Sequence, residues 1–365
     1  MSYFRAIGGI LALLAMASPL LAKERVTQAI VRTHIPQLSQ ITRFTGDIRL
    51  CGLKIPYEDA QVRERLEKEV MLAAWNRPQV LLWLKRSQRY FFHIEKILKQ
   101  ENLPQDLKYV PVVESALRPH SRSGKGAVGY WQFLKSTGTR YGLRIDKRVD
   151  ERRNLFKSTR AACLYLKKLH QEFGSYFLAL AAYNMGEFGL DTGIQAQGTR
   201  DFFSLYLPLE TQRYLLKIVA AKLIIENPEA YGFHLMPQDL YPVFSFSKIN
   251  FSLNREVPLS LIARSAGISF KTLKDYNPEI RGYYLEGKDS SVLVPKEKEK
   301  GFKQNFTILR KAWEKKVTMK FHVVMPGESL IKIAKEYKMP LAALLRLNKF
   351  SYQKVIHPGD RLRVR

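Results

Sequence analysis

The sequence contains few cysteines and no evident set of metal ligands, which narrows the classes of protein to consider. Only two cysteines occur among 365 residues, and the seven histidines are scattered. No cluster of cysteine and histidine has the spacing of a metal site, so no metal and no cofactor are expected. Cys163 lies in an apolar helical pattern, which is typical of a small buried residue. A bridge to Cys51 stays open, because sequence alone does not show proximity.

Acidic residues are also scarce. The chain has 33 Asp and Glu against 60 Lys and Arg, giving a formal net charge of +27. This balance favours a polyanionic partner, which could be a nucleic acid, an anionic membrane face or an acidic polymer. The basic residues are spread along the chain, so charge alone does not choose, and binding to nucleic acid is the weakest of these hypotheses.

The apolar run near the start of the chain is too short for a transmembrane helix, which needs about 20 apolar residues. Residues 1–22 instead have the pattern of a signal peptide. Arg5 provides the positive region, residues 7–17 are apolar, and Pro19 precedes a cleavage zone that ends at Ala22. Secretion is therefore expected, with an uncleaved signal anchor as the alternative. Any membrane association is expected only through this signal.

A long interval without carboxylates follows Glu114. Glu114 comes directly after the apolar run 110–113, and the next acidic residue is Asp146. A lone carboxylate leaving an apolar segment can have its pKa raised toward ~6 by desolvation. A general acid that cleaves a bond between two sugars needs such a pKa. The alternative is an ordinary helical glutamate that pairs with a nearby arginine.

Three motifs around and beyond Glu114 carry a family resemblance. They are Glu114-Ser115 with Ser123, Gly126-Ala127, Gly129 and Gln132-Phe133; Ala182-Tyr183-Asn184; and Glu210-Thr211 with Tyr214. Together they resemble the signatures of lytic transglycosylases, the goose-lysozyme-like enzymes of glycoside hydrolase family 23. With the C-terminal modules described below, the chain is similar to the membrane-bound lytic murein transglycosylase D group, over roughly residues 95–365.

The resemblance implies a reaction and a set of residues. Glu114 would be the single acid/base that cleaves the MurNAc-β-1,4-GlcNAc bond of peptidoglycan and leaves 1,6-anhydro-MurNAc ends. Ser115 is interpreted as a hydrogen-bonding residue at a helix end. The residues expected to hold the substrate are Ser123, Gln132, Tyr183, Asn184, Glu210 and Tyr214.

The same resemblance implies a compartment and a partner. The protein would act on peptidoglycan glycan strands in the periplasm or at the cell wall, after secretion across the inner membrane. The group usually carries a lipidated cysteine at the end of the signal, whereas the first cysteine here is Cys51. A soluble periplasmic protein is therefore expected. The oligomeric state is left open.

Residues 124–129 spell G-x-G-x-x-G, the pattern of a dinucleotide-binding loop. No apolar strand precedes it and no βαβ repeat follows, so this interpretation is rejected. We expect the glycines to let the backbone approach a ligand closely.

The fold class expected is a mainly α, lysozyme-like (α+β) catalytic domain followed by small α+β modules. Residues 23–100 are predicted to be mostly helical, with a break at Arg77-Pro78, and 101–235 to form the catalytic domain. A helix over 107–117 would place Glu114 in its last turn. A second helix over 130–141 would hold Gln132 in its first turns.

An internal repeat with a shift of 71 residues predicts two βααβ modules, at 240–297 and 320–365, joined by a linker or exposed helix at 298–319. The second copy resembles a LysM peptidoglycan-binding module, and the first is a degenerate relative. The resemblance assigns glycan binding to Gly327, Glu328, Ser329, Leu330, Ile356 and Pro358.

Two other functions stay open. A goose-type lysozyme would hydrolyse the same bond and use Asp146, Asp150 or Glu151 to position water. Asp150 is more readily interpreted as a loop acid paired with Arg152 or Arg153. A non-catalytic peptidoglycan-binding scaffold is the other alternative.

Overall fold

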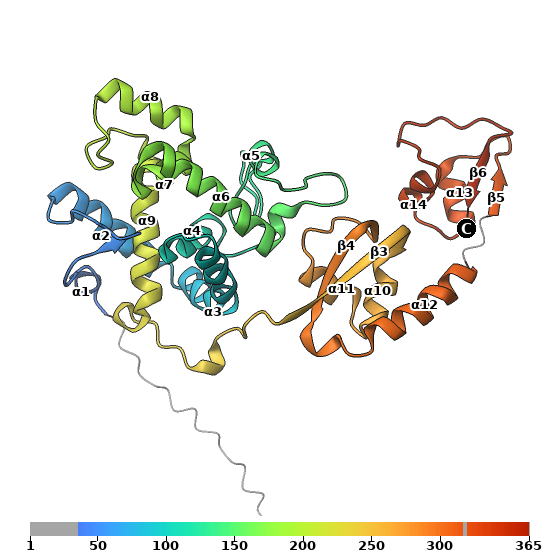
Figure 1. The fold of residues 1–365 in the computed structure, drawn as a ribbon, viewed down its shortest axis with the longest axis horizontal. Helices are drawn as coiled ribbons and strands as arrows, with labels where there is room; N and C mark the ends of the chain where they lie inside the picture. The colour runs from blue at the N-terminus through green and yellow to red at the C-terminus, as the bar shows by residue number, and fades with distance from the viewer. Residues whose placement is uncertain (1–35, 317–319, 365) are drawn as a thin grey trace, which may run out of the picture. The chain divides into compact units, whose positions relative to one another are not determined.

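The structure is a computed structural model that describes residues 36–316 and 320–364 (Figure 1). The predicted signal peptide at 1–22 and the first part of the predicted N-terminal segment lie outside the described residues. The elements before the modules are α1 (Leu38–Ile41), β1 (Arg49–Leu50), β2 (Leu53–Lys54), α2 (Ala60–Trp75), α3 (Arg77–Gln100), η1 (Gln105–Tyr109), α4 (Val110–Ser115), α5 (Lys135–Arg140), η2 (Glu151–Arg153), α6 (Leu155–Phe173), α7 (Tyr176–Met185), α8 (Glu187–Gln197), α9 (Leu209–Glu226), η3 (Pro228–Tyr231) and η4 (Pro237–Asp239).

Helices α2 and α3 begin where the sequence supplies caps. The Asp59 side chain accepts hydrogen bonds from the backbone N–H groups of Gln61 and Val62 at the start of α2. Asn76 caps α3, and Pro78 lies in its first turn, where a missing N–H costs nothing. The predicted break between two helices is therefore confirmed.

Helix α9 connects distant parts of the chain. It packs against α2, α4 and α7, so the N-terminal helices and the motif-bearing helices share one hydrophobic core (Figure 1). Tyr214, Leu215, Ile218 and Val219 of α9 are buried in this core. The apolar residues of α9 surround most of the helix, as burial against several neighbours requires.

The predicted helix over 130–141 is only partly present. Residues 130–132 form a turn, Phe133 forms an isolated bridge, and α5 begins only at Lys135. The reason is that Trp131 is anchored elsewhere: its indole N–H donates to Thr159 Oγ1 at 3.0 Å and its ring is fully buried. Gln132 has φ +48°, which is incompatible with a continuing right-handed helix. Tertiary packing here overrides the local helical pattern.

The predicted strand–helix–helix–strand order holds in both modules. The first contains β3 (Phe246–Pro258), α10 (Leu259–Ser265), α11 (Phe270–Tyr276) and β4 (Tyr284–Pro295), with β3 and β4 antiparallel. The second contains β5 (Lys320–Val323), α13 (Leu330–Glu336), α14 (Leu341–Leu347) and β6 (Arg361–Val364), with β5 and β6 antiparallel. Each module has its own core.

The segment predicted as a linker or an exposed helix at 298–319 contains a helix, in agreement with the second alternative. After η5 (Lys296–Lys298), residues Phe302–Lys316 form α12. Phe302 is buried in the core of the first module, and Phe306, Leu309 and Trp313 pack against that core. The helix is less exposed than expected, because an apolar stripe at helical spacing gives the charged segment one face to bury. The first module therefore extends beyond the predicted boundary at 297.

Candidate functional site

The backbone after Glu114 ends α4 abruptly. Ala116 and Leu117 both adopt positive φ, at +51° and +57°, a conformation unusual for residues other than glycine. Their N–H groups donate to the carbonyls of Val112 and Pro111, at 2.8 and 3.1 Å, which closes the helix end. Glu114 therefore lies in the last turn of a helix that faces a loop, as predicted.

Ser115 has the role expected for a residue at a helix end. Its hydroxyl is buried and lies 3.0 Å from the carbonyl oxygen of Pro111 and 2.8 Å from that of Tyr130. It thus connects α4 to the glycine-rich loop.

Burial raises the pKa of Glu114 to about 7. Tyr214 donates a hydrogen bond to Glu114 Oε1 at 2.6 Å, which favours the ionised form and partly opposes this rise. The negative charge of Glu210 raises the pKa further, and the positive charge of Lys217 lowers it. The side chain is only partly accessible to solvent. The carboxyl group is therefore poised to be protonated near neutral pH, as a general acid requires.

Two tyrosines from different helices lie beside this carboxyl group. Tyr214 comes from α9 and Tyr183 from α7, and the charge of Glu114 contributes to the raised pKa of each. The Tyr183 hydroxyl donates to the carbonyl oxygen of Trp131 at 2.6 Å. Tyr183 therefore fixes the loop that carries Gln132 next to the helix that carries Asn184.

The loop between α4 and α5 is held largely by its own backbone. Ser123 Oγ accepts a hydrogen bond from the Ala127 N–H at 3.1 Å, and Gln132 Nε2 donates to the carbonyls of Ser121 and Gly129. Arg122 and Phe133 both form isolated bridges with Val128. Ser123 and Gln132 thus have structural hydrogen bonds, and both are only partly buried.

Gly129 makes a close approach, although to the protein itself. A Cβ atom at this position would lie 1.9 Å from the carbonyl oxygen of Arg152, and its φ is +88°. We expected the glycines to let the backbone approach a ligand. At Gly129 the close approach is instead to the backbone of Arg152. Gly124 has no such neighbour within 4 Å of the added atom.

Arg152 is a site-supporting residue that the sequence did not reveal. Its buried guanidinium donates to both carboxylate oxygens of Asp150, at 2.8 and 2.9 Å, and to the carbonyls of Gly126 and Phe133. Asp150 is thus a paired loop acid, as the preferred interpretation held, and Arg152 holds its pKa below the usual range despite the opposing effect of burial.

Asn184 and Glu210 approach the site from α7 and α9. Asn184 Oδ1 accepts a hydrogen bond from the hydroxyl of the buried Thr211 at 2.9 Å, so the A-Y-N and E-T-x-x-Y motifs contact each other. Glu210 is exposed in the first turn of α9, one helical turn before Tyr214. The structure therefore brings together the motif residues on these two helices.

The two cysteines are not bridged. Cys163 is buried, as predicted, and Cys51 is partly buried, but both are free. Burial raises the pKa of the Cys163 thiol to about 12 and also raises that of Cys51. The disulfide alternative is wrong in this structure, and both thiols are poorly reactive.

The predicted glycan-binding residues of the second module have several structural roles. Ser329 caps α13, while Leu330 and Ile356 pack partly against the module core. Gly327 has φ +82° and Pro358 is exposed. Near these positions the module also exposes Met325, Tyr352 and Val355. Exposed apolar side chains therefore occur within a few sequence positions of the motif.

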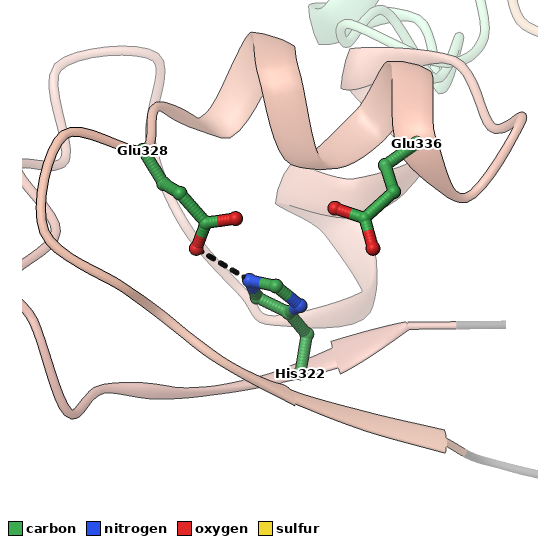
Figure 2. A group of neighbouring side chains, drawn as sticks. All are labelled: His322, Glu328 and Glu336. Atoms are coloured by element: carbon green, nitrogen blue, oxygen red, sulfur yellow. Dashed lines mark hydrogen bonds and ion pairs between the residues drawn. The ribbon is translucent and has the colours of Figure 1, made fainter.

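Glu328 belongs to a group of side chains that could hold a metal ion. Figure 2 shows His322, Glu328 and Glu336 around a common point, with their ligand atoms within 4.8 Å of one another. Glu328 Oε2 lies 2.6 Å from His322 Nε2 and accepts the Met325 N–H at 2.7 Å (Figure 2). The sequence spacing did not suggest this group. The hydrogen bonds of Glu328 tie the turn before α13 to β5, which gives the group a structural role.

Models of known protein families match segments in both halves of the chain. The transglycosylase SLT domain matches residues 91–205, the LysM domain residues 322–365, and the LysM-like domain of lytic transglycosylase MltD residues 250–311. The chain thus combines a mainly helical, lysozyme-like domain with LysM modules, and a buried acid lies at its candidate site. This combination is typical of one class of enzyme. The protein is a lytic murein transglycosylase, which acts on peptidoglycan.

A related protein shows to which group of lytic transglycosylases the chain belongs. The chain is 30% identical over 348 residues to membrane-bound lytic murein transglycosylase D of Escherichia coli (strain K12), covering 91% of this chain and 74% of that protein. The chain belongs to this family. Among the described residues, no helix combines the length and apolar character needed to cross a membrane.

Two solved structures are also similar over part of the chain. The 70 kDa soluble lytic transglycosylase of Escherichia coli is 19% identical, with a TM-score of 0.34, over 46% of this chain and 32% of that one. Lytic transglycosylase Slt of Pseudomonas aeruginosa is 21% identical, with a TM-score of 0.32, over 41% of this chain and 26% of that one.

Proposed function

We propose that the enzyme cleaves the MurNAc-β-1,4-GlcNAc bond with Glu114 as its single acid/base and forms 1,6-anhydro-MurNAc ends. Glu114 protonates the glycosidic oxygen as the bond to the leaving GlcNAc breaks. The 2-acetamido group of MurNAc attacks its own anomeric carbon and so supplies the nucleophile. Glu114 then removes the proton of the C6 hydroxyl, which attacks C1 and displaces the acetamido oxygen. No water is consumed.

The observation that carries this proposal is the burial of the Glu114 carboxyl group, which raises its pKa to about 7. With a pKa of about 7, its carboxyl group is largely protonated in mildly acidic solution and about half protonated at neutral pH, while the hydrogen bond from Tyr214 stabilises the carboxylate after it has given up the proton. General acid–base catalysis of this kind is typically worth ~10²–10⁴-fold. The remaining acceleration is assigned to substrate positioning by Ser123, Gln132, Tyr183, Asn184 and Glu210.

The carboxylates named for a hydrolase are engaged elsewhere. Asp150 is paired with Arg152, Asp146 accepts from Arg144 Nε at 2.6 Å, and Glu151 forms an ion pair with Lys157. These pairs favour the mechanism without a second carboxylate. Glu210 is the exposed carboxylate whose charge acts on Glu114, and it is the residue to test for the hydrolytic alternative.

The test is mass spectrometry of muropeptides released from purified peptidoglycan. We expect products with 1,6-anhydro ends, lighter by one water than reducing ends, and none from Glu114→Gln. Reducing-end products that disappear in Glu210→Gln would instead establish a hydrolase. An unchanged circular dichroism spectrum of Glu114→Gln serves as the folding control, because the separate core of the LysM module could keep murein binding intact even if the catalytic domain were misfolded.

We further propose that the LysM module of residues 320–365 binds glycan strands and keeps the catalytic domain on its polymer. The exposed Met325, Tyr352 and Val355, beside the motif residues Gly327 and Pro358, support this role. Tethering raises the effective concentration of substrate at the site. A periplasmic or cell-wall location follows from the substrate.

A further inference from the structure

A pocket of about 230 Å³ is formed by four helices, one of which carries the catalytic acid. Its walls come from α2, α3, α4 and α9. Val113, which precedes Glu114, lines it, and so does Arg213, which precedes Tyr214. The pocket and the catalytic carboxyl group are therefore built on the same turns of α4 and α9.

Lys217 supplies the available positive charge of this pocket. Among the described residues, no carboxylate forms an ion pair with it, and its charge reaches Glu114 strongly enough to affect the pKa of that residue. Arg213, the other cation of the pocket, is already paired with the buried Glu69. The lysine is partly buried, so an anion that meets it would be only partly screened by solvent.

A second group in the pocket lacks a partner. The indole Nε1 of Trp83 is buried and has no hydrogen bond among the described residues, although buried polar groups normally have one. Trp83 lines the same pocket as Asn76 and Gln79, whose amides can donate and accept hydrogen bonds. Leu72, Ala73, Val113 and Ala220 provide apolar walls.

From these features we infer that the pocket binds part of the peptide stem carried by the MurNAc residue undergoing cleavage. A stem offers carboxylates for Lys217, peptide carbonyls for Trp83 Nε1 and small apolar side chains for the walls. A volume of about 230 Å³ accommodates one or two residues of a peptide. The inference rests on the proposed function and adds to it a preference for strands that carry stems.

The test compares two forms of one substrate, namely glycan strands with stems and the same strands after an amidase has removed them. The readout is the ratio of kcat/KM for 1,6-anhydro formation on the two forms. Assays near pH 5 keep Glu114 protonated, so that a change in its pKa does not affect the comparison. Loss of a hydrogen bond to a charged group weakens binding by about one to two orders of magnitude, so Lys217→Met is expected to lower this ratio by roughly 10- to 100-fold.

Lys68→Met is the matched control. Lys68 is exposed on α2 and does not line the pocket, so its replacement removes the same charge without touching the pocket. It should leave the ratio unchanged. Trp83→Phe keeps an aromatic ring but removes the N–H, and a reduced ratio is expected here as well, which guards against a folding defect in one variant.

The outcomes separate this inference from the proposed function. A ratio unchanged in both Lys217→Met and Trp83→Phe, in an enzyme that still forms anhydro ends, would overturn the inference alone. An equal loss on both substrates would also overturn it, because it would show an effect on Glu114 rather than on stem binding. If the wild-type enzyme forms no anhydro ends, it is the proposed function that fails.

Discussion

The hydrogen bond from Tyr214 lowers the pKa of Glu114. The hydrogen bond from Tyr214 favours the carboxylate and holds the pKa of Glu114 below the value that burial alone would give. If Glu114 is the general acid, as we propose, it must be protonated to act, so kcat/KM should fall as pH rises through about 7.

Replacing Tyr214 by phenylalanine should move the alkaline limb of the pH profile. Without the hydrogen bond the pKa of Glu114 rises, so activity should persist to higher pH, even if its maximum is lower. Tyr231→Phe, at a buried tyrosine in η3, is the control. A limb that stays in place or moves to lower pH would contradict the role assigned to the Tyr214 hydroxyl.

The same carboxyl group should make stability depend on pH. Its pKa rises from 4.5 to about 7 on folding, so the folded state is favoured while the group is protonated. This advantage is complete below about pH 4.5 and is lost as pH rises through about 7. A shift of this size corresponds to a penalty on the order of 3 kcal/mol for the ionised form.

Glu114→Gln, which has no carboxylate to ionise, should therefore gain stability over the wild type at pH 8 and much less at pH 4. Thermal unfolding followed by circular dichroism at the two pH values measures this difference. The quantity to compare is the midpoint of the transition of the largest core, which surrounds Glu114. An equal difference in this midpoint at both pH values would mean that Glu114 is not desolvated in the folded protein.

The conformation of the loop between α4 and α5 requires a glycine at position 129 but not at position 124. Gly129→Ala would place a methyl group 1.9 Å from the Arg152 carbonyl oxygen, so either the loop or the backbone at Arg152 must move. The positive φ at this position adds strain for any residue other than glycine. We expect a loss of about 2 kcal/mol or more in the free energy of unfolding, together with lower activity. Gly124→Ala, in open space, should change neither by much. Similar effects of the two substitutions in chemical denaturation would refute this account.

The helices that carry the site could be predicted because their apolar spacing and caps are local. Glu114 in a last helical turn and the motif on α7 follow from such patterns. The turn at 130–132 could not be predicted, since it depends on the burial of Trp131 and on its hydrogen bond to Thr159, 28 positions away. The contacts of Arg152 and the pocket beside Val113 likewise arise only when distant segments pack together.

The two C-terminal modules extend the enzyme beyond its catalytic domain. If the second module tethers the enzyme, a chain ending at Lys316 should bind insoluble murein more weakly, by on the order of 10²-fold. Its turnover of short soluble glycans should stay near that of the full chain, because the motif residues around Glu114 lie in a core separate from that of the module. Co-sedimentation and product release measure the two properties, and equal losses in both would argue against tethering.

Three separate hydrophobic cores have a consequence for calorimetry. Each core excludes water independently, so heating should produce overlapping transitions rather than one cooperative endotherm, and no single Tm would describe the whole chain. The largest core contains Trp131, whereas Trp313 packs against the second core. The third core contains no tryptophan among its described members, so its melting would be silent in tryptophan fluorescence and visible only as heat.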